Sequence, residues 1–235
     1  MHQKSIGKLE FNVVNELSIE IEEKLRKAIE LHTSFEKMKN VFKFIGEGAC
    51  GEVFALSEEH ILKINTSRFA NEHTPDGTIL NDLQGVSFIP KLYCYSTCNR
   101  FIVVQRVKGV TVRQYLDGRD NFFMPSSLDS ERDHLNKVKQ FTKDCAKRGW
   151  YPNDAHKSNV MIDYKGNFWV VDVGLFQTDV YDTDDSEYDL VRYWYSVVST
   201  IDFHMMKDRE LYALTNPKKM ETIFINPLEA VVQAF

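Results

Sequence analysis

The sequence predicts an α+β fold in which a five-stranded lobe precedes a mostly helical lobe. Short runs of β-branched and aromatic residues, separated by glycines or polar turns, occur throughout residues 41–107. In residues 108–235, apolar side chains recur mainly at helical spacing. A length of 235 residues suits one large domain or two small lobes. We therefore expect an N-terminal extension over residues 1–40, followed by the two lobes.

Composition places the chain among globular proteins and disfavours several classes of partner. Hydrophobic residues make up 43% and charged residues 27%, which is typical of a folded domain rather than a disordered one. The net charge of −5 argues against binding to nucleic acid or to acidic membranes. Cys94 and Cys98 have no second cysteine pair at zinc-site spacing, and free thiols favour a reducing compartment.

No targeting or membrane segment is evident in the sequence. Residues 1–15 contain no apolar run of signal-peptide length. No stretch approaches the ~18 apolar residues of a membrane span. We expect a cytoplasmic protein, or one that is secreted without a cleavable signal into the cytosol of a host.

The N-terminal extension carries one helical pattern, over residues 16–38. Ile21, Leu25 and Ile29 fall at helical spacing, with Glu and Lys between them. We expect this amphipathic helix to pack on the domain that follows. A separate helix that binds a partner is the alternative.

Five strands and one helix are predicted in the first lobe. From Phe42 onward, the runs FKFIG, EVFAL and HILKIN indicate a three-stranded meander. Thr74 and Pro75 mark a helix start, and Ile79 and Leu80 supply the buried face of that helix. The runs IPKLY and RFIVVQRV add two strands.

The second lobe is predicted to be helical apart from one hairpin. Residues 129–147 indicate a core helix, and residues 186–206 are apolar nearly all round, as in a buried central helix. Between them, the runs VMID and FWVV flank the turn YKGN, which indicates a hairpin.

A glycine-rich segment, GEGACGEV, lies between the first two strands. Gly46, Gly48 and Gly51 form a GxGxxG pattern, but a strand follows it, whereas a dinucleotide-binding fold requires a helix there. This arrangement suits a flap over ATP phosphates, where missing side chains let backbone N–H groups approach. Hairpin turns are the other common use of such glycines.

Lys63 lies inside the apolar strand HILKIN. Charged side chains are rarely buried without a partner. An edge lysine that points to water is one interpretation. The other is a positive charge on the α- and β-phosphates, held by a carboxylate from the following helix. The position of Lys63, one strand after the glycine-rich segment, favours the second.

Three polar side chains of the second lobe have the spacing of a magnesium and acceptor site. Asp154 and Asn159 are five apart in the loop YPNDAHKSN, and Asp172 follows the strand FWVV beside Gly174. Phosphoryl transfer needs a carboxylate near the acceptor hydroxyl and oxygen ligands for Mg²⁺. Because a hairpin joins its two ends, Asn159 and Asp172 should lie close together. The alternative is that these residues belong to an ordinary solvent-exposed turn without a function in catalysis.

These segments, in this order, resemble the protein-kinase-like superfamily over residues 41–205. GEGACGEV resembles the glycine-rich loop, HILKIN the strand with the phosphate-binding lysine, NDAHKSN the catalytic loop and VDVG the metal-binding segment. The resemblance implies a bilobal kinase fold that binds ATP and Mg²⁺ between the lobes. RFIVVQRVKG then resembles the hinge.

The resemblance assigns a role to each residue of the site. Asp154 and Lys63 would be catalytic, and Asn159 and Asp172 would hold Mg²⁺. Val104 would be the gatekeeper residue beside the adenine. The residues expected to contact ATP are Gly46, Gly48, Gly51, Val53, Lys63, Asp76, and the backbone of Gln105 and Val107.

The chain also departs from the kinase pattern. Pro152 and Asn153 replace the usual His and Arg before the catalytic aspartate, and Val173 replaces the usual Phe. The helix carboxylate that pairs with Lys63 is Asp76, Glu72 or neither. Asp76 stands where the family has Glu and is one methylene shorter.

The segment between Asp172 and Asp189 is too short for a full activation segment. In its compact size the chain resembles the Bud32-like and Rio-like kinases. It also resembles the minimal effector kinases of bacterial pathogens, of the HopBF and OspG/NleH types. The resemblance implies a compact Ser/Thr-type protein kinase with a protein substrate. For an effector, that substrate would be a host chaperone or signalling protein.

Two other functions remain open at this point. The acidic residues within 179–187 favour a small-molecule phosphotransferase of the aminoglycoside or choline kinase kind, although such a run is more often a solvated loop. Pro152 and Asn153 favour a nucleotide-binding pseudokinase.

Overall fold

Two antiparallel sheets organise the residues that the computed structural model describes, which are 1–48, 51–65, 76–116, 140–152, 158–163, 165 and 167–178. Residues 140–146 are also helical. The other elements, in chain order, are β1 (His2–Ile6), β2 (Leu9–Val13), α1 (Ile19–Leu31), α2 (Phe35–Val41), β3 (Lys43–Glu47), β4 (Gly51–Ala55), β5 (His60–Asn65), α3 (Asp76–Asp82), β6 (Leu92–Ser96), β7 (Phe101–Gln105), β8 (Gly109–Thr111), α4 (Val112–Leu116), β9 (Val160–Asp163) and β10 (Phe168–Val170).

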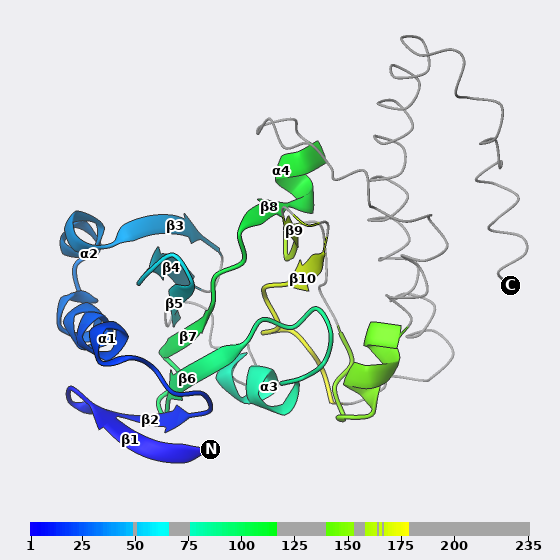
Figure 1. Cartoon of the computed structure of the whole chain (residues 1–235), viewed down its shortest axis with the longest axis horizontal. Helices are drawn as coiled ribbons and strands as arrows, with labels where there is room; N and C mark the ends of the chain where they lie inside the picture. The colour runs from blue at the N-terminus through cyan, green and yellow to red at the C-terminus, as the bar shows by residue number, and fades with distance from the viewer. Residues whose placement is uncertain are drawn as a thin grey trace, which may run out of the picture.

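The larger sheet has seven strands in the order β1-β2-β6-β7-β5-β4-β3, rather than the five expected (Figure 1). Strands β3 to β7 correspond to the five predicted runs. The two additional strands lie in the N-terminal extension, where only a helix was expected. Phe11 and Val13 are buried and alternate with polar residues, which is a strand pattern. Gly7, at φ +65°, makes the tight turn that joins β1 to β2.

The predicted helix over residues 16–38 is two helices. Ser34 has an extended backbone (φ −130°, ψ 105°) and its side chain accepts a hydrogen bond from the Lys37 N–H. This N-cap starts α2 in a new direction after α1 has ended. Ile21 and Leu25 are buried as predicted, whereas Ile29 is only partly buried.

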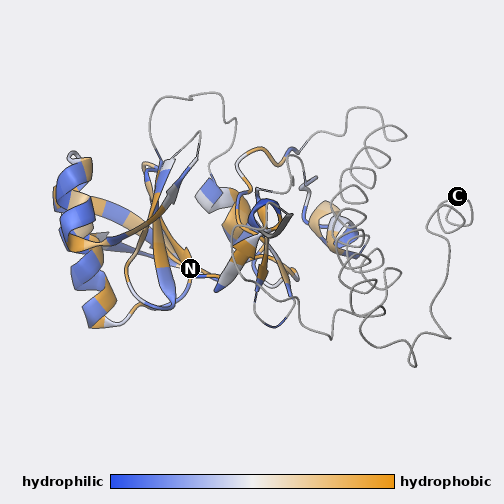
Figure 2. Cartoon of the chain, turned by 90° about the horizontal axis from the view of Figure 1, so that it is seen from above, coloured by the Kyte–Doolittle hydropathy of each residue, from blue (hydrophilic) through white to orange (hydrophobic). Residues whose placement is uncertain are grey.

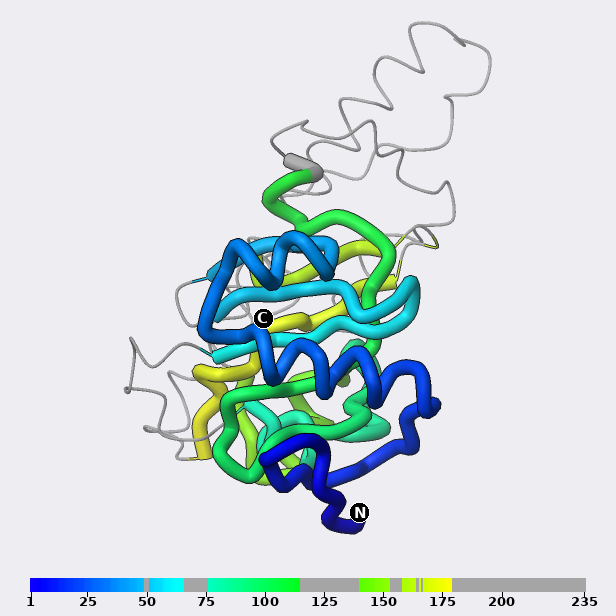
Figure 3. Tube along the Cα trace, turned by 90° about the vertical axis from the view of Figure 1, so that its left-hand side faces the viewer, coloured from blue at the N-terminus to red at the C-terminus, as the bar shows by residue number. Residues whose placement is uncertain are grey.

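The larger sheet has a different core on each face. On β5, Leu62 and Ile64 point to the face that α1 and α2 cover, as Figure 3 shows with both helices in front of the strands. Because side chains alternate along a strand, Ile61 and Lys63 point to the opposite face. Helix α3 and the hairpin β9–β10 cover that face (Figure 2). We call it the inner face.

The described part of residues 108–178 contains the core helix and the hairpin that the sequence predicts. Phe141 and Cys145 are buried on the helix over 140–146, within the helix predicted over 129–147. Strands β9 and β10 form the predicted hairpin, and β8 adds a third strand that was not predicted. The helix predicted over 186–206 lies outside the described residues. None of the helices in the described part of the chain is long and apolar enough to cross a lipid bilayer.

Candidate active site

The inner face brings one lysine between two carboxylates from distant parts of the chain. The Lys63 ammonium donates a hydrogen bond to Asp76 Oδ2 and another, of 3.1 Å, to Asp172 Oδ1. Strand β5 supplies Lys63, helix α3 supplies Asp76, and Asp172 follows β10. The two carboxylates differ in accessibility, since the Asp76 side chain is 2% exposed and that of Asp172 is 39% exposed.

Helix α3 places Asp76 against the lysine. Asp76 opens the helix, where a carboxylate interacts favourably with the helix dipole. Ile79 and Leu80 are buried against the sheet, as predicted. Glu72 lies outside the described residues.

Burial and charge act in opposite directions on the Lys63–Asp76 pair. Burial alone would lower the pKa of Lys63, but the charges of Asp76 and Asp172 and their hydrogen bonds raise it above the usual value. Lys63 is therefore protonated at neutral pH. Burial raises the pKa of the Asp76 carboxyl, and the charge of Lys63 opposes that rise. Asp76 Oδ1 is buried and has no hydrogen-bond partner among the described residues.

The hairpin β9–β10 brings the backbones of the two predicted magnesium ligands together. Val160 pairs with Val170, and the Val171 N–H donates to the Asn159 carbonyl at 2.9 Å. Asn159 therefore lies across the hairpin from the residue that precedes Asp172. In the described ranges, no group of three or more His, Cys, Asp and Glu side chains is placed to hold a metal. A Mg²⁺ site here would need oxygens from phosphate and water as well.

Asp163 stabilises the turn of this hairpin. Its carboxylate accepts hydrogen bonds from the backbone N–H groups of Lys165 and Asn167 at 2.8 and 2.9 Å. The side chains of Asn167 and Trp169 each donate a further bond of 3.0 Å. Burial alone would raise the pKa of Asp163, but these four bonds lower it below its usual value.

The glycines of the predicted phosphate loop differ in what the fold requires of them. A Cβ on Gly51 would lie 2.5 Å from the Ile64 carbonyl oxygen, so the pairing of β4 with β5 requires glycine there. A Cβ on Gly46 or Gly48 would meet no atom within 4 Å. The Gly48 N–H donates to the Gly51 carbonyl and is not directed to a ligand. Residues 49–50 lie outside the described part of the chain.

Apolar residues flank Lys63 on the neighbouring strands. Val53 on β4 and Ile102 on β7 lie directly opposite Lys63 in the two registers. Val53 therefore shares the inner face with the lysine, next to the glycine-rich segment.

The predicted hinge is tied into the sheet. The Gln105 N–H donates to the Lys91 carbonyl at 2.8 Å, so a contact of Gln105 with a base would have to use its carbonyl oxygen. Val104 is buried in the inner-face core, and Val107 is partly exposed. The neighbouring Arg106 N–H donates to the Glu59 carbonyl at 2.8 Å.

Sequence reasoning missed the residues that hold the other end of α3. Trp150 Nε1 donates to Asp82 Oδ2 at 3.1 Å, and the Arg148 guanidinium donates to the Asp82 carbonyl at 2.7 Å. The sequence does not indicate that a Trp and an Arg after a core helix would contact α3. Val173, where kinases usually have Phe, is 2% exposed and packs in the inner-face core.

Several predicted residues lie outside the described part of the chain. They include the expected catalytic residue Asp154, its neighbour Asn153, and the acidic residues of 179–187.

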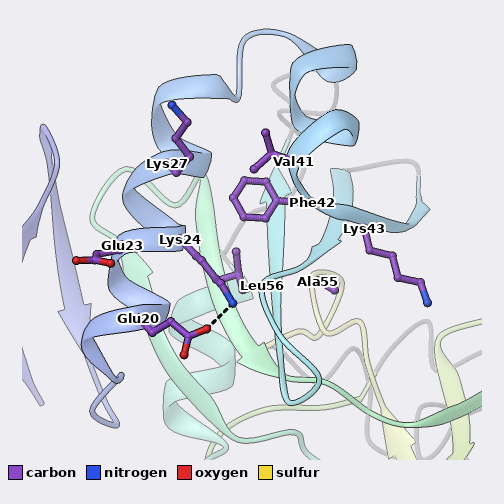
Figure 4. A pocket seen from close by; sticks show the side chains of 9 residues that line it. All are labelled: Glu20, Glu23, Lys24, Lys27, Val41, Phe42, Lys43, Ala55 and Leu56. Carbon is purple, nitrogen blue, oxygen red and sulfur yellow. Dashed lines mark hydrogen bonds and ion pairs between the residues drawn. The ribbon is translucent and has the colours of Figure 1, made fainter.

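A groove of about 400 Å³ on the α1 side of the sheet does not belong to this site (Figure 4). Its lining carries charges of both signs, and none of the predicted site residues takes part. The lining residues are Glu20, Glu23, Lys24, Lys27, Val41, Phe42, Lys43, Ala55 and Leu56.

Comparison with curated proteins finds similarity to a kinase. The chain is 26% identical over 152 residues to "Putative serine/threonine-protein kinase YrzF" of Bacillus subtilis (strain 168), over 62% of this chain and 66% of that protein. This similarity supports a kinase-like fold. No protein-family model matches the chain.

Among solved structures, two of WbdD are similar to the chain. A high-resolution crystal structure of WbdD has a TM-score of 0.48 at 11% identity, over 66% of this chain and 37% of that one. A medium-resolution structure of "the bifunctional kinase-methyltransferase WbdD" has a TM-score of 0.47 at 12% identity, over 63% and 34%. The chain thus spans about a third of the WbdD chains and just under two thirds of YrzF.

Proposed function

We propose that this chain is an ATP- and Mg²⁺-dependent phosphotransferase, namely a compact Ser/Thr-type protein kinase without a full activation segment. The observation that carries the proposal is the position of Lys63. A largely buried, charged lysine on the inner face contacts one buried and one partly exposed carboxylate. A cation held in this way suits the recognition of phosphate groups.

The two carboxylates would have different roles. Asp76 is almost fully buried and would remain the fixed partner that orients Lys63. Asp172 is accessible and would turn from Lys63 to a metal, together with Asn159. Lys63 would then direct its charge at the α- and β-phosphates.

The surroundings of Lys63 fit a nucleotide. A Cβ on Gly46 or Gly48 would meet no atom within 4 Å, and phosphates would approach the glycine-rich segment from this open side. Val53, opposite Lys63 on β4, is partly exposed and would provide apolar surface beside the lysine. ATP would supply the transferred phosphoryl group, and Mg²⁺ would neutralise its charge.

Asp154 would position the acceptor hydroxyl. This assignment depends on its spacing from Asn159, since Asp154 is not among the described residues. The similarity to YrzF, which is named as a serine/threonine-protein kinase, favours a protein as the acceptor. We extend the proposal to a bacterial effector that acts in the cytosol of a host, on a chaperone or signalling protein, because the chain resembles the minimal effector kinases.

The test is transfer of labelled phosphate in a cell lysate. The purified protein is incubated with γ-labelled ATP and Mg²⁺, beside Asp172→Ala and a matched control, Asp144→Ala. Asp144 is a surface carboxylate that bonds to Lys147 and Gln140. We expect a labelled protein band with the wild type and the control, and none with Asp172→Ala.

Other outcomes would replace the proposal. Label on an aminoglycoside or on choline, with no labelled protein, would make the chain a small-molecule phosphotransferase. Binding of ATP with no transfer to any acceptor would make it a nucleotide-binding pseudokinase.

A further inference from the structure

The contact between Asp76 and Lys63 requires α3 to lie unusually close to the sheet. An aspartate is one methylene shorter than a glutamate, yet the Asp76 carboxylate hydrogen-bonds to the Lys63 ammonium. The Asp76 side chain is 2% exposed, so the helix and the strand enclose it almost completely. Some feature of the packing must therefore shorten the distance between α3 and β5.

The closest approach of α3 to the sheet is at Gly77, the residue after Asp76. A Cβ on Gly77 would lie 2.5–2.7 Å from Cγ, Cδ2 and Cβ of Tyr95 on β6. Real Cβ atoms do not approach other carbons so closely, so any other residue here would push the helix outward. Glycine is also unfavourable inside a helix, and its presence calls for a packing explanation.

The Tyr95 side chain cannot move aside to accept a larger residue. It is 6% exposed, and its hydroxyl donates a hydrogen bond of 3.9 Å to Met1 Sδ. Asn12 lies directly opposite Tyr95 in the pairing of β2 with β6. The added N-terminal hairpin thus braces the ring on which α3 packs.

The other end of α3 is held as well. Asp82 bonds to both Trp150 and Arg148 of the second lobe. The helix can therefore not pivot about its first turn to relieve a clash at Gly77.

We propose that Gly77 is a positioning residue, which sets the distance between α3 and the sheet so that the short Asp76 carboxylate reaches Lys63. Asp76 and Gly77 form a matched pair, in which the missing Cβ compensates for the missing methylene. The consequence for catalysis rests on the proposed function of Lys63 in ATP binding.

A double-mutant cycle tests the pairing of Asp76 with Gly77. Gly77→Ala moves α3 away, and Asp76→Glu is too long for the close spacing. We expect each single change to lower kcat/KM for ATP about tenfold, which lies within the range of coupling found between residues in contact. The double variant should recover to within about threefold of the wild type. KM for the acceptor should not change in any of them, and Asn81→Ala on the same helix is the matched control.

Either of two results would overturn the matched pair. One is wild-type activity in Gly77→Ala or in Asp76→Glu, a variant that retains the close packing at Gly77. The other is a double variant whose kcat/KM for ATP is no higher than that of the less active single variant. That result would mean that Gly77 is needed only for folding.

Crystal structures of the variants separate this inference from the proposed function. The Lys63–Asp76 contact should be lost in Gly77→Ala and return in the double variant, whether or not ATP binds. An unchanged contact in Gly77→Ala overturns the inference. A wild type whose melting temperature does not respond to Mg²⁺ and ATP contradicts only the proposed function.

Discussion

The Lys63–Asp76 ion pair can be broken from one side or replaced as a whole, and the two changes should differ in stability. Lys63→Met removes the cation and leaves a buried carboxylate whose only described side-chain partner was Lys63. Breaking a buried pair in this way typically costs about 3 kcal/mol. For a chain of this length, that corresponds to a fall in melting temperature of about 6–12 °C. The double variant Lys63→Met/Asp76→Asn has no charge at position 76 and should recover part of the loss, because a buried neutral amide costs less than a buried carboxylate.

The loss in Lys63→Met should depend on pH. Burial raises the pKa of Asp76 and Lys63 opposes the rise, so removing Lys63 raises the folded-state pKa further. A carboxyl group whose pKa is higher in the folded state than in the unfolded state does not destabilise the fold at a pH below its unfolded-state pKa. Its cost grows as pH rises towards the folded-state value. Lys63→Met should therefore be closer to wild type at about pH 5 than at about pH 8, whereas the double variant should show no such trend.

Thermal unfolding, followed by circular dichroism at both pH values, measures these effects. Asp144→Ala is the control, because it removes a surface carboxylate far less buried than Asp76. A Lys63→Met protein as stable as the wild type at the higher pH would refute the reasoning. So would a double variant less stable than Lys63→Met.

Four further variants test other parts of the structure. Asp163→Ala removes four hydrogen bonds from the β9–β10 turn and should lower the melting temperature by about 4–8 °C, for a loss of about 2 kcal/mol. Because the pKa of Asp163 is lowered, this difference from wild type should shrink as pH falls through that pKa, in the same unfolding assay. Gly51→Ala should destabilise by about 1–3 kcal/mol in urea unfolding, whereas Gly46→Ala should be within about 0.5 kcal/mol of wild type. Trp150→Phe removes the bond to Asp82 and should cost about 1 kcal/mol in the same titration.

The strands of the first lobe could be predicted because their patterns are local. HILKIN carries its own alternation, with Leu62 and Ile64 on one face and Lys63 on the other. The N-terminal strands were missed because only Phe11 and Val13 of β2 mark a buried face. Their pairing with β6 depends on a partner about 80 residues away in sequence, which no local pattern reports.

The residues of the candidate site could be named from the sequence, but not all of their contacts. The hairpin predicted that Asn159 and Asp172 would be neighbours, since turn and strand signals bracket it. The choice between Asp76 and Glu72 depended on where α3 begins and how closely it packs. The distance between α3 and the sheet is set by the contact of Gly77 with Tyr95 on β6. Nothing in the local sequence around Gly77 indicates this contact.

The central claim is that Lys63, held by Asp76, serves phosphate transfer. The most direct measurement is phosphotransfer from γ-labelled ATP by Lys63→Met/Asp76→Asn, compared with the wild type under the same conditions. We predict a folded double variant that is more stable than Lys63→Met and shows no detectable transfer. Transfer at the wild-type rate by that variant would contradict the account.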